Sequence, residues 1–263
     1  MSKNISNNQV STINSNKKSF TIEVHQTENA FLILSSEWSK LVKLMNTPHP
    51  FYEPEWQFSW WREFGEGKLK IFAIRDNNQN LIGIFPLELE KSGTLRLIGG
   101  KDLSDYLDVI IKNEFEEICL ELFLKYLKNS DLPWKQIKFR GIPDGSPTLK
   151  ILKKIVGDNL ELIKEEVCPI IKLSDTWDLF LESLEPRFKK NLLRKIRKVE
   201  TDQNIDFYES KDNLENDMEF FISLHSMSQP EKAEFWNDKR KGFFFEMAKR
   251  MSEKNMLRLS FLD

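Results

Sequence analysis

Hydrophobic positions along the chain repeat with two different spacings. A three-to-four-residue repeat predicts helices at 38–45, 54–64, 114–128 and 147–156. Alternating or continuous apolar runs predict strands at 20–26, 69–75, 81–89, 94–100, 106–111, 136–142 and 160–172. Strands interleaved with helices indicate an α/β or α+β fold, in which mixed sheets are flanked by helices.

The pattern changes near residue 174 and becomes mostly helical. A helix with apolar residues from Trp177 to Leu184 is followed by a basic helix that starts at Pro186, a short strand at 205–210 and helices near 212–227 and 238–253. The Asn- and Ser-rich start is too polar to pack. We therefore expect a disordered tail at 1–18, a first domain at 19–167 and a second unit at 168–263.

The second unit repeats part of the first as a weak pattern. Both parts contain an apolar helix, an aromatic helix, a strand and an acidic turn, but the second part stops before a returning strand. A hydrophobic strand without a neighbour leaves an unpaired edge. We therefore expect the second domain to be truncated at residue 263.

Charge is nearly balanced over the whole chain but concentrated in one helix. The 39 basic and 41 acidic residues give a formal charge of −2, so the whole chain has no net attraction for nucleic acid. From Arg187 to Lys198, however, seven of twelve residues are Lys or Arg. At 100° per residue, Arg187, Lys190, Arg194 and Arg197 span about 80° of arc and form a cationic edge.

The opposite side of this helix is apolar, with Phe188, Leu192 and Ile196, and we expect it to pack inward. Lys189 falls within the apolar arc and must either extend its amine past it or find a charged partner. The cationic edge is either a solvated surface or a binding site for phosphates. Free nucleic acid is not an expected partner, because no second basic stretch with interleaved aromatic residues occurs.

Three further residues are candidates for catalysis. Asp108 and Tyr106 lie on one face of the strand at 106–111, where a buried carboxylate can act as a general base. His225 points to the apolar side of its helix, as a packing residue or a base. For Asp108 and Tyr106 the alternative is an ordinary polar loop that enters a strand.

Several classes of site and location are not indicated. Cys119 and Cys168 have no metal-ligand spacing and are interpreted as reduced packing residues, and we expect no metal. No signal peptide is apparent, and no segment has the ~18 apolar residues of a membrane span. We therefore expect a cytoplasmic protein.

Several longer stretches, in order and spacing, resemble one family. These are "FYEPEWQFSWWREFG", "LIGIFPLEL", "SDYLDVI", "CPIIKLSDTWDLFLESLEPRFKKNLLRKIRKVE" and "LHSMSQPEKAEFW" with "LRLSFLD". They resemble GNAT-superfamily acyltransferases of the cellulose-biosynthesis acetyltransferase (CelD-like) type, which are related to FemAB peptidyltransferases. The similarity covers residues 30–263.

The resemblance implies tandem GNAT-like domains and transfer of an acyl group from acetyl-CoA or another acyl-CoA to an amine or hydroxyl of a small-molecule or saccharide acceptor. It also favours phosphates as the ligand of the cationic edge. A FemAB-like peptidyltransferase that uses aminoacyl-tRNA is one alternative. No "QxxGxG" phosphate loop occurs in the sequence, so a catalytically silent GNAT-like binding or scaffold domain is another.

Overall fold

The fold is built on one mixed sheet. The computed structural model describes residues 9–15, 18–100, 102–201, 205 and 207–262. Seven strands form this sheet: β1 (Gln9–Ser15), β2 (Lys18–His25), β3 (Lys68–Arg75), β4 (Leu81–Leu89), β5 (Thr94–Leu97), β6 (Ile110–Ile111) and β7 (Gln136–Lys138). The order is β1-β2-β3-β4-β5-β7, with β6 also paired to β4. All pairs are antiparallel except β5 with β7. The predicted mixed α/β fold is therefore confirmed at this level.

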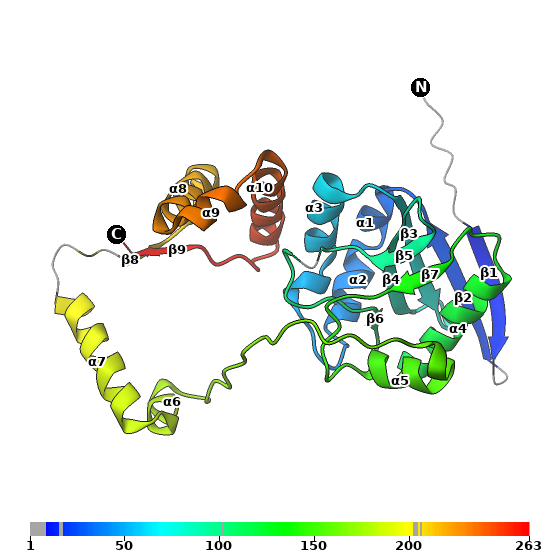
Figure 1. Cartoon of the computed structure of the whole chain (residues 1–263), viewed down its shortest axis with the longest axis horizontal. Coiled ribbons are helices and arrows are strands. Elements are labelled where there is room, and N and C mark those ends of the chain that lie inside the picture. The colour runs from blue at the N-terminus through cyan, green and yellow to red at the C-terminus, as the bar shows by residue number, and fades with distance from the viewer. Residues whose placement is uncertain (1–8, 16–17, 101, 202–204, 206, 263) are drawn as a thin grey trace.

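Helices cover both faces of this sheet (Figure 1). One face packs on α4 (Glu116–Asn129) and α5 (Pro147–Val156), and the other on α1 (Asn29–Ile33), α2 (Ser35–Val42) and α3 (Pro54–Phe64). In β3, Phe72 and Ile74 join the first core cluster, whereas Ile71 and Ala73 join the second. Burial on both faces explains why β3 and β4 are nearly continuous apolar runs.

The chain after residue 174 forms helices and a small sheet. The helices are α6 (Trp177–Ser183), α7 (Pro186–Thr201), α8 (Leu214–Ser228), α9 (Pro230–Phe235) and α10 (Asp238–Glu253). Strands β8 (Phe207–Glu209) and β9 (Ser260–Leu262) pair antiparallel. Two short 3₁₀ turns, η1 (Pro50–Tyr52) and η2 (Gly157–Asn159), complete the elements of the described residues.

Helix α10 packs against α3 and completes the second core cluster. Phe243 is fully buried, and its ring lies 5.2 Å from that of Trp56 and 6.1 Å from that of Phe64. Met247 and Met251 belong to the same cluster. The later helical part of the chain therefore shares a hydrophobic core with the sheet through α10 and through Leu257, which follows it.

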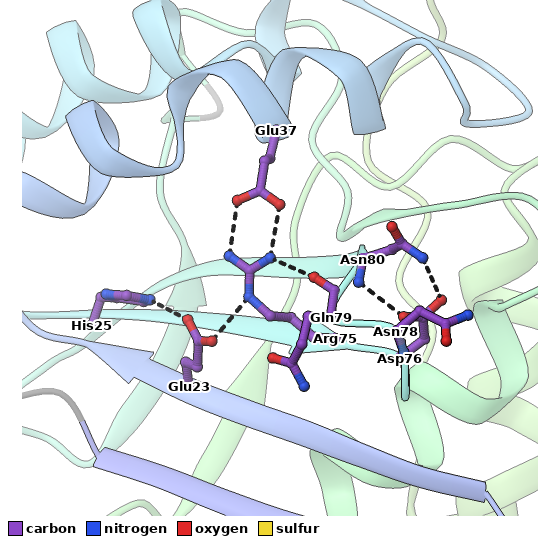
Figure 2. A network of polar contacts seen from close by, with 8 residues as sticks. All are labelled: Glu23, His25, Glu37, Arg75, Asp76, Asn78, Gln79 and Asn80. Atoms are coloured by element: carbon purple, nitrogen blue, oxygen red, sulfur yellow. Dashed lines mark hydrogen bonds and ion pairs between the residues drawn. The ribbon is translucent and has the colours of Figure 1, made fainter.

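An arginine network ties α2 to the sheet (Figure 2). The guanidinium of Arg75 on β3 donates two hydrogen bonds to Glu37 of α2, at 2.7 and 2.9 Å, and one to Glu23 of β2, at 2.9 Å. The hydrogen bond from Arg75 lowers the pKa of Glu37, and the hydrogen bond with His25 is the main cause of the lowered pKa of Glu23. This network therefore fixes α2 against the sheet.

The structure differs from the sequence-based expectations at both ends of the first unit. Residues 9–15 form β1 instead of part of a disordered tail, because they pair along β2 and Ile13 packs on the core; residues 1–8 lie outside the described residues. Residues 160–172 contain no strand, because no neighbouring strand pairs with them. The predicted strand at 106–111 is reduced to β6, and α1 and α9 were not predicted.

The expected inward packing of the basic helix was wrong. Helix α7 has no buried residue: Phe188 is 57% exposed, and Leu192 and Ile196 are only half-buried. In Figure 1, α6 and α7 stand apart from the sheet at the end of an extended segment. Periodicity predicted the two faces of this helix, but it carries no information about what covers the apolar one.

Candidate functional site

A loop interrupts the strand that lies beside β4. β5 and β6 both pair with β4, Leu97 opposite Leu87 and Ile110 opposite Ile84, so residues 98–109 leave the sheet and return to the same neighbour. The backbone N–H of Leu107 donates to the carbonyl of Gly141, 3.0 Å away, which ties the end of this loop to the segment after β7. The loop thus places Tyr106 and Asp108 just before β6, which pairs with β4.

Tryptophans of α3 hold the beginning of this loop. The indole N–H of Trp56 donates to the Ser104 hydroxyl at 2.9 Å, and that hydroxyl donates to the carbonyl of Gly99 at 2.8 Å. Gly100 has φ of 67°, and a Cβ at this position would lie 2.0 Å from the indole nitrogen of Trp60. The close approach of the loop to α3 therefore requires glycine here.

The carboxyl group of Asp108 is buried next to Ser146, the residue that precedes α5. It is 7% exposed, accepts a hydrogen bond from the backbone N–H of Val109 at 2.7 Å, and also accepts one from the Ser146 hydroxyl. Ser146 is the N-cap of α5 and accepts from the Thr148 N–H at 3.1 Å. Burial raises the pKa of Asp108 to about 6, although hydrogen bonds from Ser146, Thr148 and Val109 oppose the shift.

Tyr52 is a buried tyrosine whose hydroxyl is affected by the charge of Asp108. Its side chain is 1% exposed, and its hydroxyl has no hydrogen-bond partner among the described atoms. Burial raises the pKa of Tyr52, and the charge of Asp108 raises it further. A buried hydroxyl without a partner is costly, so the Tyr52 hydroxyl retains an unused capacity for a hydrogen bond.

His49 and Tyr106 form the outer part of the same cluster. Their rings lie 4.6 Å apart, and the His49 ring meets the Tyr52 ring edge to face at 5.5 Å. Partial burial lowers the pKa of His49 and thereby favours the neutral imidazole, and the charge of Asp105 opposes that shift. A hydrogen bond with Cys168 raises the pKa of Tyr106.

His49, Tyr52, Tyr106 and Asp108, which we term the loop cluster, form two layers. Tyr52 and Asp108 are buried, whereas His49 and Tyr106 are partly exposed, so an incoming molecule meets the latter two first. An imidazole whose pKa is lowered and a carboxyl group whose pKa is raised to about 6 can accept a proton near neutral pH, and the two phenols can donate hydrogen bonds.

Sequence reasoning identified Asp108 and Tyr106 but missed His49 and Tyr52. Their available signal was the segment "TPHPFYEP", in which three prolines restrict the backbone around both residues. Cys168 is free and half-buried, and its thiol lies 3.9 Å from the carbonyl of Asp105. Cys119 is free and buried.

The structure does not bring His225 to the loop cluster. His225 lies on α8, and its Nδ1 accepts a hydrogen bond from the Trp236 indole at 3.0 Å. The rings of Phe221, Phe235 and Trp236 lie within 6.0 Å of it. In Figure 1, α10 stands between α8 and the sheet that contains β6. These contacts are those of a packed histidine.

The cationic edge also lies away from the loop cluster. Arg187, Lys190, Arg194 and Arg197 are all exposed on α7. Lys190 and Arg197 line a hollow of about 500 Å³, together with Glu182, Leu184, Pro186, Lys189 and Leu193. This hollow is formed by α6, α7 and the turn between them.

Two further observations concern metals and membranes. Within the described ranges, no group of three His, Cys, Asp or Glu side chains is placed to hold a metal ion. In the same part of the chain, no helix has the length and apolar character needed to cross a bilayer.

Comparison with protein-family models, with curated proteins and with solved structures gives no match to this chain.

Proposed function

We propose that this chain belongs to a GNAT-type acyltransferase that moves an acyl group from acyl-CoA to an amine or hydroxyl of a small-molecule or saccharide acceptor. The proposal rests on the resemblance of its sequence motifs and on the loop cluster. The mixed sheet, with its antiparallel strands and a parallel β5–β7 pair beside the loop, is consistent with it. In this proposal residues 19–167 and 168–263 belong to two GNAT-like domains.

The observation that carries the proposal is the Asp108 carboxyl, with its pKa raised to about 6, near the unpartnered hydroxyl of Tyr52. Acyl transfer requires loss of a proton from the acceptor as its nitrogen or oxygen bonds to the thioester carbon and the carbon–sulfur bond breaks. The leaving thiolate of CoA then takes up a proton. In this proposal His49, on the outer side, accepts the acceptor's proton first, and the charge of Asp105 favours the imidazolium that forms. Asp108 is the deeper base of the cluster.

Phosphate anchoring does not come from the start of α4. Its first turn carries the carboxylates of Glu116 and Glu117, which interact with the positive end of the helix dipole. Their negative charges repel an anionic ligand at that end. This observation favours a second candidate function, in which the chain is a catalytically silent domain that binds its ligand without turnover. Acyl-CoA would then be anchored elsewhere or not bound at all.

A turnover assay with the purified chain separates these candidates. Acetyl-CoA is incubated with a panel of amines and hydroxyl compounds, release of free CoA thiol is followed, and acetyl-CoA binding is measured by calorimetry. We expect turnover, with a loss of about a hundredfold or more in Asp108→Asn. The matched control His225→Gln should retain the activity of the unmodified chain, because His225 lies outside the loop cluster.

The outcomes are distinct. Binding of acetyl-CoA without turnover supports the silent domain. Turnover that survives Asp108→Asn but is lost in His225→Gln contradicts the assignment of the loop cluster. Absence of both binding and turnover across the panel contradicts acyl transfer from acetyl-CoA.

A further inference from the structure

Helix α7 separates cationic and apolar residues onto different faces and buries neither of them. Phe188, Leu192, Leu193, Ile196 and Val199 occupy one side, and none of them is buried. Phe188 is 57% exposed and Val199 is 36% exposed. A surface helix normally covers its apolar side with the core of its own domain. In this structure that side of α7 has no such cover.

Exposed apolar side chains continue on both sides of the turn before α7. In α6, Trp177 and Leu179 are about half-exposed, at 52% and 50%. In the preceding extended segment, Ile170, Ile171 and Leu173 are 79%, 74% and 81% exposed. Figure 1 shows α6, α7 and this segment on one side of the molecule, away from the sheet. Apolar exposure of this extent commonly marks an interaction surface.

The charge of α7 is opposite to that of the rest of the chain. Seven of the 39 basic residues and one of the 41 acidic residues lie in α7, so the remainder has a formal charge of −8. An anionic surface therefore attracts α7 and repels the remainder. Any attachment to such a surface is oriented, with α7 in contact and the sheet away from it.

A soluble phosphate compound would match only one of the two faces. It would neutralise the cationic edge but leave Phe188 and its neighbours in water. An anionic bilayer matches both faces at once, because lipid phosphates lie beside the basic side chains and the acyl chains receive the apolar ones. Lys189, within the apolar arc, can extend its amine to the headgroups.

The hollow between α6 and α7 lies at the boundary of these two faces. Lys190 and Arg197 reach it from the cationic edge, and Lys189 and Leu193 reach it from the apolar arc. This is the depth at which a headgroup phosphate lies when an amphipathic helix is embedded parallel to a bilayer. We propose that α7 forms a docking surface for an anionic lipid bilayer and lies in the plane of the interface, with the exposed apolar residues Trp177 and Leu179 of α6 beside it. This inference is independent of acyl transfer.

Vesicle flotation with the full chain tests this surface. One set of vesicles contains phosphatidylcholine alone, and a second set contains phosphatidylcholine mixed with phosphatidylglycerol. We expect the chain to float with the second set only, and added salt to weaken this binding because it screens the headgroup charge. Both results follow from the charge of α7.

Three variants separate the contributions of charge and apolar contact. Lys190→Glu with Arg194→Glu and Arg197→Glu should weaken binding by about a hundredfold or more, since each basic residue contributes about a factor of five. Phe188→Ser with Leu192→Ser should weaken it by about tenfold or more, with all charges retained. Because α7 buries no residue, circular dichroism should show that both variants keep the fold.

The matched control reverses the same number of charges elsewhere. Lys125→Glu, Lys128→Glu and Lys150→Glu, all exposed on α4 and α5, should leave flotation unchanged. Failure to float with anionic vesicles overturns the proposal. Equal loss in the control variant overturns the assignment to α7, and undiminished binding by the Phe188→Ser, Leu192→Ser variant shows purely electrostatic attraction without insertion.

Two other occupants would give different results. If a second copy of the chain covers the apolar side, sedimentation shows a dimer that Phe188→Ser dissociates, without flotation. If RNA is the partner, binding to RNA fragments survives Phe188→Ser with Leu192→Ser, and anionic vesicles do not compete. Either result refutes the bilayer as the partner of α7.

Discussion

Replacement of Asp108 by Asn should stabilise the protein at neutral pH and have little effect at acidic pH. The carboxyl is buried, and burial raises its pKa from 3.8 to about 6. The folded state therefore holds the proton more tightly than the unfolded state does. Asn has the shape of the protonated acid, but it never ionises.

The magnitude follows from this shift. At 1.36 kcal/mol per pKa unit, the shift corresponds to about 3 kcal/mol. Because the pKa is raised on folding, the stabilising contribution of the protonated group is fully present below about pH 4 and is lost as the pH rises through about 6. The Asn variant does not lose it, so its advantage over the unmodified chain should grow by up to about 3 kcal/mol between these values.

Urea unfolding at a series of pH values between about 4 and 8 measures this difference. Other carboxyl groups titrate in both proteins and cancel in the comparison. Parallel curves of unfolding free energy against pH for the two proteins would refute the argument that Asp108 titrates near pH 6. Ser146→Ala is a useful companion, because loss of a hydrogen bond that lowers the pKa should move the transition to higher pH.

Three further substitutions test the packing around the candidate site, each by urea unfolding at pH 7. Arg75→Met should lower the free energy of unfolding by about 1–3 kcal/mol, because Glu37 loses two hydrogen bonds. Glu37→Gln should lower it less. If Arg75→Met were as stable as the unmodified chain, the network would be dispensable. Phe243→Ala should lower the free energy of unfolding by about 3–5 kcal/mol, because the side chain is fully buried. A decrease below about 1 kcal/mol would contradict a shared core between α10 and α3. Gly100→Ala should destabilise the protein strongly, because the added Cβ would overlap the Trp60 side chain. Gly145→Ala should be nearly neutral, because no atom lies within 4 Å of its added Cβ. Similar effects at both positions would contradict the close approach of Gly100 to Trp60.

Local sequence patterns predicted most of the sheet and its covering helices. The apolar runs at 69–75 and 81–89 correspond to β3 and β4, and the helix predicted at 147–156 matches α5. These segments carry their own signals: a polar turn between two apolar runs, or Ser-Pro at a helix start. The segment at 160–172 carries the same apolar character, but a strand also needs a neighbour to pair with, which no local pattern reveals.

The candidate site was predicted only in part for a similar reason. Asp108 was a candidate from its strand position, but its burial depends on Ser146 and Thr148, which lie far along the chain at the start of α5. His49 and Tyr52 have no periodic pattern, since they lie between prolines in a loop and a 3₁₀ turn. Their place beside Tyr106 arises from tertiary packing.

The contact between α3 and α10 has a consequence for how the chain is made. The tryptophans of α3 leave the ribosome well before Phe243, and at about 5–20 residues per second the delay is roughly 10–40 s. During that interval the apolar side of α3 lacks its final cover. Nascent chains of this protein should therefore bind chaperones until α10 has been synthesised.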